Sequence, residues 1–418
     1  MIPIRIFVAV CFILPLVDSQ GSVIKVGANE TVHSIVEGIS TANPGDTLLI
    51  MPGLYREGNI ILKKSVSLIG QNFPILDGEN KYEILTIHAN NLSIQGLKFI
   101  DTGIASINDL AAIKVVESKG LKIDGNQFEN SFFGIYLANS SESVISNNRL
   151  KANAEAEHQI GNGIHLWKCD NVTVTGNHIE GHRDGIYFEF VTNSVITNNR
   201  SEGNLRYGLH FMFSHNDEYR RNTFMNNGAG VAVMYTKGVR MIDNTFEHNW
   251  GSSSYGLLLK EIRDSYVDSN RFISNSVGIL MEGSSRIEFK GNVFLTNGYA
   301  IRLQASCDDN TFERNNFMTN TFDLVTNGTL VLNKINGNYW DKYDGYDLNH
   351  DGVGDIPYHP VSIYGMIIEQ MPTAVLLWRS FLVYLIDRTE RAIPAMTPEN
   401  LKDEFPSMKP YDLISQHF

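Results

Sequence analysis

A short hydrophobic pattern recurs along the middle of the chain, between about residue 126 and residue 340. Each copy starts with glycine, or alanine in the last copy, after which the first and third positions are apolar and the second varies. The copies are Gly134–Leu137, Gly163–Leu166, Gly185–Phe188, Gly208–Phe211, Gly230–Val233, Gly256–Leu259, Gly278–Met281 and Ala300–Leu303. An alternation of period two is typical of a β-strand that buries one face. We therefore expect the first and third positions to point into a core and the second to point outward.

The spacing of these copies predicts a solenoid. Successive copies start 22 to 29 residues apart, and a column of asparagines repeats out of phase with them. These are Asn126, Asn148, Asn177, Asn199, Asn222, Asn244, Asn270, Asn292, Asn315 and Asn338. The period is too short for a helical-hairpin repeat and lacks a leucine-rich consensus. It fits one turn of an all-β, parallel β-helix, in which asparagine suits the corner because it tolerates left-handed backbone angles and its amides can bond along the stack.

The flanks of the repeat suggest a division of the chain. We expect an N-terminal cap and first strands at residues 20–60, the β-helix at 61–340, an acidic loop at 341–360, and a docking helix with an extended tail at 361–418. In the cap, Thr31–Thr41 has helical spacing after a possible cap at Asn29 or Thr31. A helix there would cover the hydrophobic cross-section of the first coil.

Residues 1–19 have the pattern of a signal peptide. Arg5 precedes an apolar run from Ile6 to Val17, followed by a short cleavage context that ends at Ser19. The run is too short to cross a bilayer core of about 30 Å, so a membrane anchor is the less favoured interpretation. We expect an exported protein whose mature chain begins near Gln20, in a bacterial periplasm.

Charge and cysteine content narrow the possible partners and cross-links. The formal net charge is -12, which argues against nucleic acid or an anionic polysaccharide as a non-specific partner. Cys11 lies in the signal segment, which leaves Cys169 and Cys307. The repeat places these two cysteines six coils apart, roughly 29 Å at about 4.8 Å per strand. A disulfide needs Cα atoms within about 7 Å, so both are expected to be free thiols.

Two coils carry insertions. One occupies residues 151–159 and the other residues 250–255. Extra residues in a solenoid must loop out at a corner, often on a working face, although a tolerated surface loop explains them equally well.

The outward positions of the repeat suggest a copper site. Met212 and Met234 occupy equivalent places on adjacent coils, about 4.8 Å apart, and His210 precedes Met212 by two residues on the same face. Two thioethers and an imidazole suit Cu(I). His165 lies two coils from His210, roughly 10 Å away with Tyr187 between them, so it would serve a second position or an ion on a partner. Exposed Met and His are also ordinary on a face that docks another protein.

A catalytic carboxylate pair is harder to find. Glu189 and Glu282 face outward but lie four coils apart, roughly 19 Å. Asp184 precedes its strand at a corner, where a polar residue is expected in any case. Lyases and hydrolases need converging acidic groups, and the repeat brings none together, so we expect no enzyme.

The acidic loop contains a calcium-like motif. Its ligand positions hold Asp347, Asn349, Asp351, Val353 and Asp355, with Gly352 at the sixth place. Tyr358 stands where a bidentate glutamate normally completes the site. Calcium therefore competes with a second interpretation, a tight acidic turn without an ion.

The C-terminal region contains an apolar helical stretch. Met371–Arg391 is expected to be one helix that follows Pro372, too short and interrupted to cross a membrane. Its large apolar side chains must be covered, either by folding back on the last coil or by docking into a membrane-embedded partner or a bilayer surface. The partner-binding candidates are Trp378, Phe381, Leu382, Tyr384 and Leu385. Residues 393–418 are expected to form an extended arm along a surface.

Two groups of motifs resemble known families. The Pro44–Thr47 and Pro52–Tyr55 turns and the asparagine-rich coils resemble the pectin-lyase-like right-handed parallel β-helix, in its carbohydrate-binding and sugar-hydrolase repeat group. The aromatic and acidic stretch Gly337–Tyr358 closely resembles a signature of the NosD family, periplasmic maturation factors for the copper centre of nitrous oxide reductase.

This resemblance implies a function for the chain. It implies an accessory protein that receives or presents copper and docks on NosY, the membrane subunit of an ABC transporter whose ATPase is NosF. A copper chaperone and nitrous oxide reductase would be its clients, and it would sit in the periplasm, held at the inner membrane by its protein partner. The alternative is a periplasmic β-helix that binds or modifies a polysaccharide, as a lyase, hydrolase or epimerase.

Overall fold

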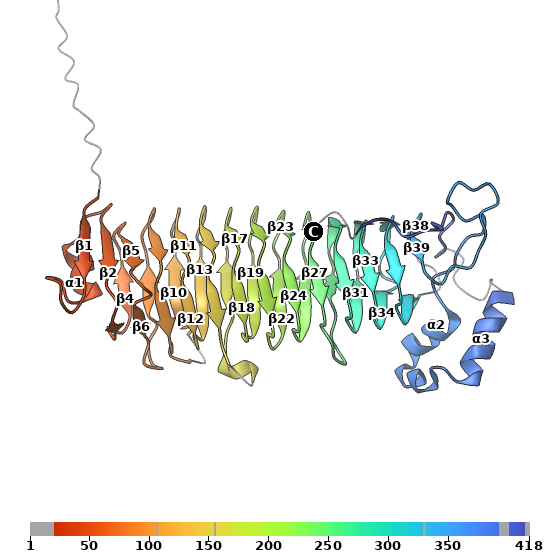
Figure 1. Cartoon of the computed structure of the whole chain (residues 1–418), viewed down its shortest axis with the longest axis horizontal. Helices are drawn as coiled ribbons and strands as arrows, with labels where there is room; N and C mark the ends of the chain where they lie inside the picture. Colours follow the sequence, from red (N-terminus) through yellow and green to blue (C-terminus); the bar gives the residue numbers. More distant parts are fainter. Residues whose placement is uncertain (1–20, 106–107, 154–155, 329–331, 393–400, 414–418) are drawn as a thin grey trace, which may run out of the picture.

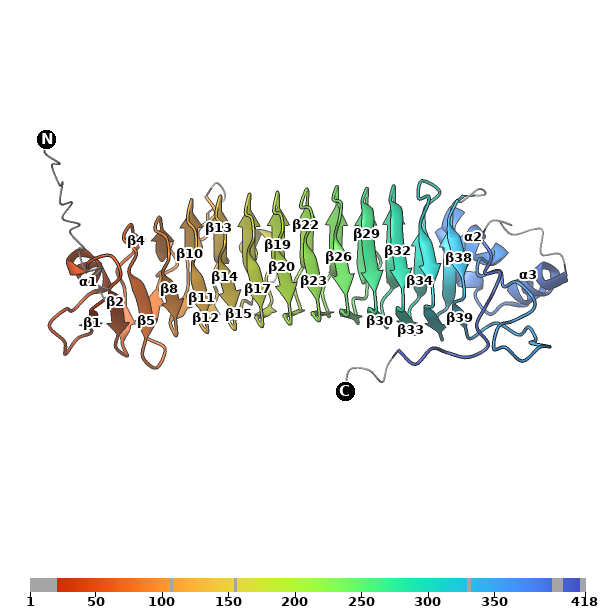
Figure 2. The same cartoon turned by 90° about the horizontal axis from the view of Figure 1, so that it is seen from above.

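The computed structural model describes residues 21–105, 108–153, 156–328, 332–392 and 401–413. They form one elongated parallel β-helix with helices at its C-terminal end (Figures 1 and 2). Each coil contributes one strand to each of three sheets, which we name A, B and C in the order in which the chain visits them. The predicted all-β parallel solenoid is confirmed.

The strands of each sheet follow one another along the solenoid axis. Sheet A contains β1 (Val23–Val26), β2 (Thr47–Ile50), β5 (Ser67–Gly70), β8 (Ser93–Gln95), β11 (Lys122–Asp124), β14 (Val144–Ser146), β17 (Thr173–Thr175), β20 (Val195–Thr197), β23 (Glu218–Arg220), β26 (Arg240–Ile242), β29 (Arg263–Asp268), β32 (Ser285–Lys290), β35 (Thr311–Glu313) and β38 (Lys334–Asn336). Sheet B contains β3 (Leu54–Tyr55), β6 (Ile75–Asp77), β9 (Lys98–Ile100), β12 (Gln127–Glu129), β15 (Arg149–Lys151), β18 (His178–Glu180), β21 (Arg200–Glu202), β24 (Thr223–Met225), β27 (Thr245–Glu247), β30 (Arg271–Ile273), β33 (Val293–Leu295), β36 (Asn316–Met318) and β39 (Tyr339–Trp340). Sheet C contains β4 (Ile60–Leu62), β7 (Leu85–Ile87), β10 (Ala111–Val116), β13 (Phe133–Ala138), β16 (Ile164–Trp167), β19 (Asp184–Glu189), β22 (Tyr207–Met212), β25 (Ala229–Met234), β28 (Leu257–Lys260), β31 (Val277–Glu282), β34 (Tyr299–Leu303) and β37 (Phe322–Thr326).

The core follows the alternation seen in the sequence. In β13, Ile135 and Leu137 are fully buried while Tyr136 between them faces outward. Inward aromatic rings also stack from coil to coil, as in sheet B, where Phe272 and Phe294 lie 4.9 Å apart and nearly parallel. The eight copies of the repeat all fall in sheet C, which also includes β37. The repeat pattern misses β37 because Asp323, rather than glycine, precedes its inward Leu324.

Asparagine ladders fix the corner between sheets A and B. In each coil the side-chain oxygen accepts from the preceding asparagine, and the amide donates to the next one. For example, Asn199 donates its backbone and side-chain N–H groups to Asn222 Oδ1 at 2.9 and 3.0 Å, and Asn222 donates in turn to Asn244. The Asn222 amide also bonds the Ile196 carbonyl at 3.0 Å. Every polar group of this buried side chain is therefore paired, which is what a buried amide requires.

The helix of the N-terminal cap is shorter than the predicted Thr31–Thr41. Helix α1 spans Ile35–Thr41, and its N-cap is Ser34, whose hydroxyl accepts from Glu37 N at 3.1 Å, rather than Asn29 or Thr31. Val32 pairs with Val26 as an isolated bridge instead of starting the helix. The proposed signal segment, residues 1–19, lies outside the described residues. Cys169 and Cys307 are both buried and free, as the coil spacing predicts.

The C-terminal region completes a last, interrupted coil. Val361 pairs with Leu324 of sheet C, Asp403 with Ile335 of sheet A, and Ser407 with Tyr339 of sheet B. The C-terminal helices are inserted between the first two of these contacts. Both ends of the helical unit are thus anchored to the end of the solenoid.

The predicted single helix Met371–Arg391 is wrong. The structure has α2 (Ile363–Gln370), the 3₁₀ helix η2 (Pro372–Leu377) and α3 (Phe381–Ala392). The chain breaks between η2 and α3, where Arg379 adopts a left-handed φ of 65°. Helix α2, which the sequence pattern missed, starts at the Ser362 cap and packs on β37. Within the described residues, no helix is long and apolar enough to cross a membrane.

Candidate functional site

The outer face of sheet C carries the residues singled out by the repeat. The strand register places Met212 directly opposite Met234, and His210 opposite Ala232. On the other side, Tyr187 stands between His165 and His210, as predicted. Both methionines are half-buried, and the Tyr187 hydroxyl lies 3.8 Å from Met212 Sδ. The structure therefore brings Met212, Met234 and His210 onto adjacent strands, while His165 stays two coils away.

The two histidines face outward but are covered by their neighbours. His165 is 9% exposed and His210 7% exposed. The His210 ring lies between Tyr187 and Tyr207, at centroid distances of 4.9 and 4.8 Å. Burial lowers the pKa of His165 to about 3, with a further contribution from the nearby Arg183, so this imidazole is neutral. Neutral imidazole is the form that binds metal ions.

A buried carboxylate lies behind His210. Asp184 is fully buried and accepts two bonds from the Arg206 guanidinium, at 2.9 and 2.5 Å. His210 Nδ1 lies 3.6 Å from Asp184 Oδ2. Burial alone would raise the pKa of Asp184, but its contacts with His210 and Arg206 and the charge of Arg206 lower the pKa below its usual value. Asp184 is therefore an anion on the outer face of the solenoid.

The two insertions flank this cluster. Both leave the solenoid between sheets B and C, and they project from the lower edge of Figure 1, where α2 and α3 also lie. In the second insertion, Tyr255 stacks near Tyr207 at 6.4 Å. In the first, Glu157 lies close enough to raise the pKa of Arg206, after the larger effect of Asp184. The irregular coils thus border a stretch of sheet C in which polar groups such as Asp184 and His210 are buried on the outer face.

A row of aromatic rings adjoins the methionines, exposed at Phe190 and Phe213 and half-buried at Tyr235. The three rings lie just past the ends of β19, β22 and β25 and stack at 5.3 and 5.1 Å. All three have left-handed φ angles, from 51° to 56°, at a position that holds Asn139 in an earlier coil. Bulky residues rarely adopt this conformation. The repeat alignment missed these rings, together with Arg206, Tyr207 and Tyr255, because it followed only the columns within the strands.

The acidic loop uses its carboxylates to close turns. Asp347 accepts from the N–H groups of Asp351 and Gly352, at 3.2 and 2.9 Å, and Asp355 accepts from Leu348 N at 2.7 Å. Gly352 has a φ of 86°, as a calcium loop or a tight turn requires. Among the described residues, no three His, Cys, Asp or Glu side chains are arranged to hold a metal ion. Calcium binding by Asp347, Asn349, Asp351, Val353 and Asp355 stays a prediction.

The C-terminal partner candidates divide into two groups. Trp378 packs back on Phe322 and Tyr364, at 5.1 and 5.8 Å, and is 41% exposed. The others lie on α3 and are between 44% and 74% exposed: Phe381, Leu382, Tyr384 and Leu385. Part of the apolar stretch therefore covers the last coil, while α3 still presents an apolar surface.

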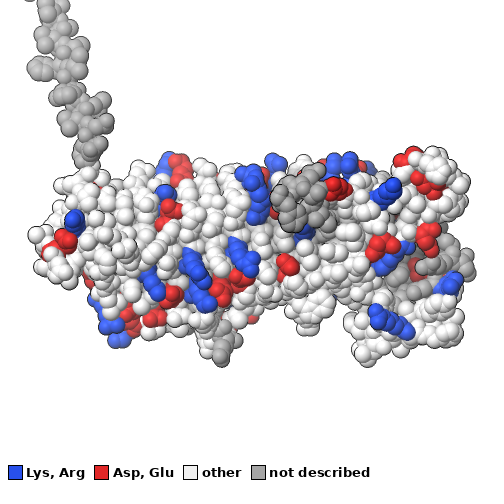
Figure 3. Space-filling view, in the orientation of Figure 1, with Lys and Arg blue, Asp and Glu red and all other residues white. Residues whose placement is uncertain are grey.

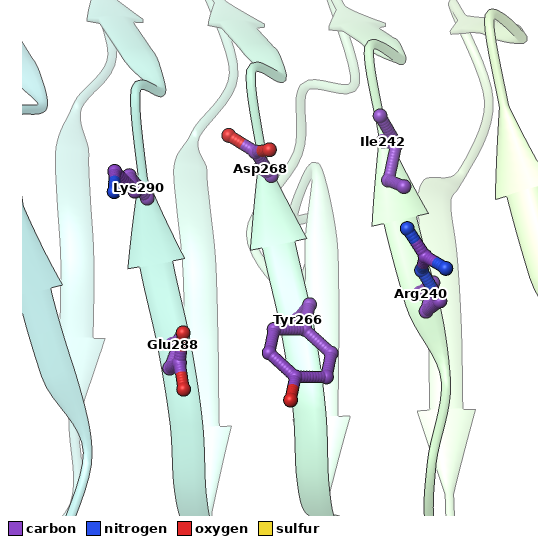
Figure 4. A pocket seen from close by; sticks show the side chains of 6 residues that line it. All are labelled: Arg240, Ile242, Tyr266, Asp268, Glu288 and Lys290. Atoms are coloured by element: carbon purple, nitrogen blue, oxygen red, sulfur yellow. The ribbon is translucent and has the colours of Figure 1, made fainter.

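The outward carboxylates considered in the sequence lie on separate coils. The register confirms that Glu189 and Glu282 lie four strands apart. A shallow hollow on the outer face of sheet A is lined by side chains of both charges around an exposed tyrosine (Figure 4), namely Arg240, Ile242, Tyr266, Asp268, Glu288 and Lys290. On the side shown in Figure 3, positive and negative side chains are interspersed, without a large field of one sign.

Comparison with solved structures shows the fold. An exopolygalacturonase of family 28 from Yersinia enterocolitica is 12% identical and aligns with a TM-score of 0.61, over 76% of this chain and 78% of its own. The surface protein and adhesin PfbA of Streptococcus pneumoniae is 14% identical, with a TM-score of 0.55 over 72% of this chain and 93% of its own. At such identities these enzymes and adhesins share only the β-helix with this chain.

Comparison with protein families is more specific. Residues 153–345 match the family model described as periplasmic copper-binding protein (NosD). A probable ABC transporter binding protein NosD from Pseudomonas aeruginosa is 28% identical over 90% of this chain and 91% of its own length. A protein of the same description from Stutzerimonas stutzeri is 24% identical, over 92% of both chains. The family match covers the outer-face cluster, and the two relatives align with 90% and 92% of this chain, so the chain is similar to the NosD family of periplasmic copper-binding proteins over most of its length.

Proposed function

We propose that this protein receives and presents Cu(I) for assembly of the copper centre of nitrous oxide reductase. The observation that carries the proposal is the register of Met212 and Met234, which places two thioethers side by side next to His210. Soft sulfur ligands together with an imidazole nitrogen suit Cu(I) better than harder ions. The similarity to the NosD family of copper-binding proteins supports copper as the cargo, and a copper chaperone and the reductase would be the donor and the client.

In this proposal the rigid solenoid holds the ligand side chains in place, and these side chains provide the affinity for copper. Met212 and Met234 would make the first contact with copper because they are more accessible than His210. His210 would join after a small movement of the Tyr187 and Tyr207 rings that enclose it. His165, two coils away, would serve a second position or an ion held by the partner.

The docking role falls to α3. Four large apolar side chains on a short helix are exposed there, and the helical unit is anchored to β34 of the solenoid by the Arg302–Glu369 ion pair, at 2.6 Å. Such a face suits a groove in a membrane-embedded protein. We propose that α3 binds the membrane subunit of an ABC transporter, NosY, which with the ATPase NosF would hold the protein at the periplasmic side of the inner membrane. The names of the relatives as transporter binding proteins support this assignment.

A copper competition experiment tests the first part. The exported chain is titrated with Cu(I) against bicinchoninate, in comparison with Met212→Ala and Met234→Ala. Met225→Ala is the matched control, because Met225 is also a half-buried methionine at the last position of a strand, but on sheet B. We expect each of the first two variants to weaken Cu(I) binding about tenfold or more, and the control to bind as the wild type does. Equal binding by all four proteins would contradict the proposal, as would retention of a glycan without any copper uptake.

A co-purification experiment tests the second part. Phe381→Ser and Leu382→Ser together should abolish recovery of the protein with the membrane subunit, because they remove the two most exposed apolar side chains of α3. Leu348→Ser, equally exposed but in the acidic loop, is the control. Recovery of the α3 variant at the wild-type level would show that another surface binds the transporter.

A further inference from the structure

Asp184 is placed where the fold does not require a charge. Its column on the outer face of sheet C holds Tyr207, Ala229, Val277, Tyr299 and Phe322 in later coils. These residues cover the same face by apolar packing. A buried ion pair is seldom more stabilising than well-packed apolar groups of similar size. The fully buried Asp184 therefore needs an explanation other than stability.

The side chain that gives Asp184 a role is its neighbour His210. Neither ring nitrogen of His210 makes a hydrogen bond of normal length to a described residue, although both are buried. A buried polar group without a partner destabilises a fold and calls for a specific reason. Asp184 Oδ2 lies 3.6 Å from His210 Nδ1, within reach of a hydrogen bond after a small shift. Arg206 holds the carboxylate from the other side by two bonds, so Asp184 itself cannot turn away.

We propose that Asp184 is a positioning residue for the proposed copper site of Met212, Met234 and His210. Its carboxylate fixes the tautomer and orientation of His210 so that Nε2 is the nitrogen that binds the metal. Histidines that bind metals usually donate their other N–H to a carboxylate, which fixes the ring and raises its basicity. Arg206 completes the arrangement because it locks the carboxylate and balances its charge. The inference rests on the proposed copper function and adds a residue that does not touch copper.

The first test measures copper affinity. Asp184→Asn keeps the shape of the side chain and removes its charge, and it should weaken Cu(I) binding in the bicinchoninate competition by about 10-fold. The matched control is Asp264→Asn, which alters another aspartate paired with an arginine 22 residues further on, Arg286, at 2.6 Å but on the exposed surface of sheet A. The control should bind copper as the wild type does. In the double variant with His210→Ala, Asp184→Asn should cause no further loss, because two residues that act through one contact are not additive.

The second test begins with a measurement on the wild-type protein, which does not depend on a variant that folds. In the ¹⁵N-histidine spectrum of the wild-type protein without copper, His210 should carry its proton on Nδ1, the tautomer that the carboxylate selects. X-ray absorption of the copper-loaded wild type should show a nitrogen neighbour that is lost in Asp184→Asn. A proton on Nε2, or a folded Asp184→Asn that binds copper with unchanged affinity, would overturn the positioning role and leave the proposed function standing. Absence of Cu(I) uptake by the wild-type protein would overturn both.

Discussion

Two regions of the solenoid use buried polar groups in opposite ways. At the corner between sheets A and B, the same asparagine recurs in ten successive coils, and each one bonds to the next. On the outer face of sheet C, between the two insertions, each coil presents a different side chain, and polar groups such as Asp184 and His210 are buried at a cost. The ladder makes every coil equivalent, whereas the outer face makes one stretch unlike the rest. Repetition therefore indicates what builds the fold, and the break in repetition indicates where to look for function.

The largest effect is expected in the middle of the ladder. Asn222→Ala leaves the backbone and side-chain N–H groups of Asn199 without their shared acceptor and the Ile196 carbonyl without the amide donor, while Asn244 Oδ1 keeps only the bond from the backbone N–H of residue 222. Each unpaired buried group costs about 1 to 3 kcal/mol, so we expect a loss of about 3 to 5 kcal/mol in the free energy of unfolding by urea. Asn226→Gly is the control, since Asn226 is exposed and its φ of 53° is one that glycine adopts freely. A loss below about 1 kcal/mol in Asn222→Ala would mean that the ladder does not stabilise the coils.

A somewhat smaller effect is expected at the end of the ladder. Asp403, supplied by the returning C-terminal segment, accepts from the backbone and side-chain N–H groups of Asn338 and from Trp340 Nε1 at 2.8 to 3.1 Å. Asp403→Ala should cost about 2 to 4 kcal/mol, because these donors lose a charged acceptor.

The loss should be local, because Asp403 closes only the last coil. Hydrogen exchange should accelerate in β38 and β39 and stay unchanged in the middle coils. Glu404→Ala, which removes an exposed carboxylate next in sequence, should leave the exchange of β38 and β39 unaffected. Uniform acceleration along the solenoid would instead show that the coils unfold as a single unit.

A substitution that increases the stability of the protein is expected at Asp217, a buried carboxylate at the corner before sheet A. Asp217 lies in the column before the strands of sheet A, where Asn310 and Asn333 stand in later coils. Burial, only partly offset by a hydrogen bond from Ser194 N, raises the pKa of Asp217 to about 8. Between its unfolded pKa of about 4 and pH 8, the folded state holds a proton that the unfolded state has lost. The wild-type protein therefore loses stability as the pH rises through this window.

Asp217→Asn should remove this dependence and restore the residue used elsewhere in the column. We expect the variant to be more stable than the wild type by about 2 kcal/mol at pH 7, with a gap that widens by at most about 1.4 kcal/mol per pH unit from pH 4 to 8. Thermal unfolding at several pH values measures the gap. A constant difference across this range would show that Asp217 ionises normally in the folded state.

Most of the fold, but only part of the candidate site, could be predicted from the sequence. The 22-residue spacing determined which residues become neighbours, so the pairing of Met212 with Met234 and the separation of Cys169 from Cys307 followed directly. It did not contain the break at Arg379 between η2 and α3, because helical periodicity continues across it. Nor did it indicate that His165 and His210 are covered, because their burial depends on how aromatic side chains and the insertions pack outside the strands. The Arg206–Asp184 contact was within reach, since the two residues are one coil apart.

The smallest effect on stability is expected at the aromatic corner beside the methionines. Phe213 is 37% exposed and held at a φ of 51°, which asparagine tolerates much better than phenylalanine. Phe213→Asn gives up ring stacking with Phe190 and Tyr235 but relieves backbone strain, and the two terms are of similar size. We expect the free energy of unfolding to change by less than about 1 kcal/mol, a smaller change than at the ladder asparagines. Phe211→Asn is the contrasting variant, because Phe211 lies two residues earlier in β22 and is fully buried, so its replacement should unfold the coil. A loss of more than about 2 kcal/mol in Phe213→Asn would assign these rings to the fold; a neutral result would mean that the aromatic corner, like Asp184 behind it, is not required for stability.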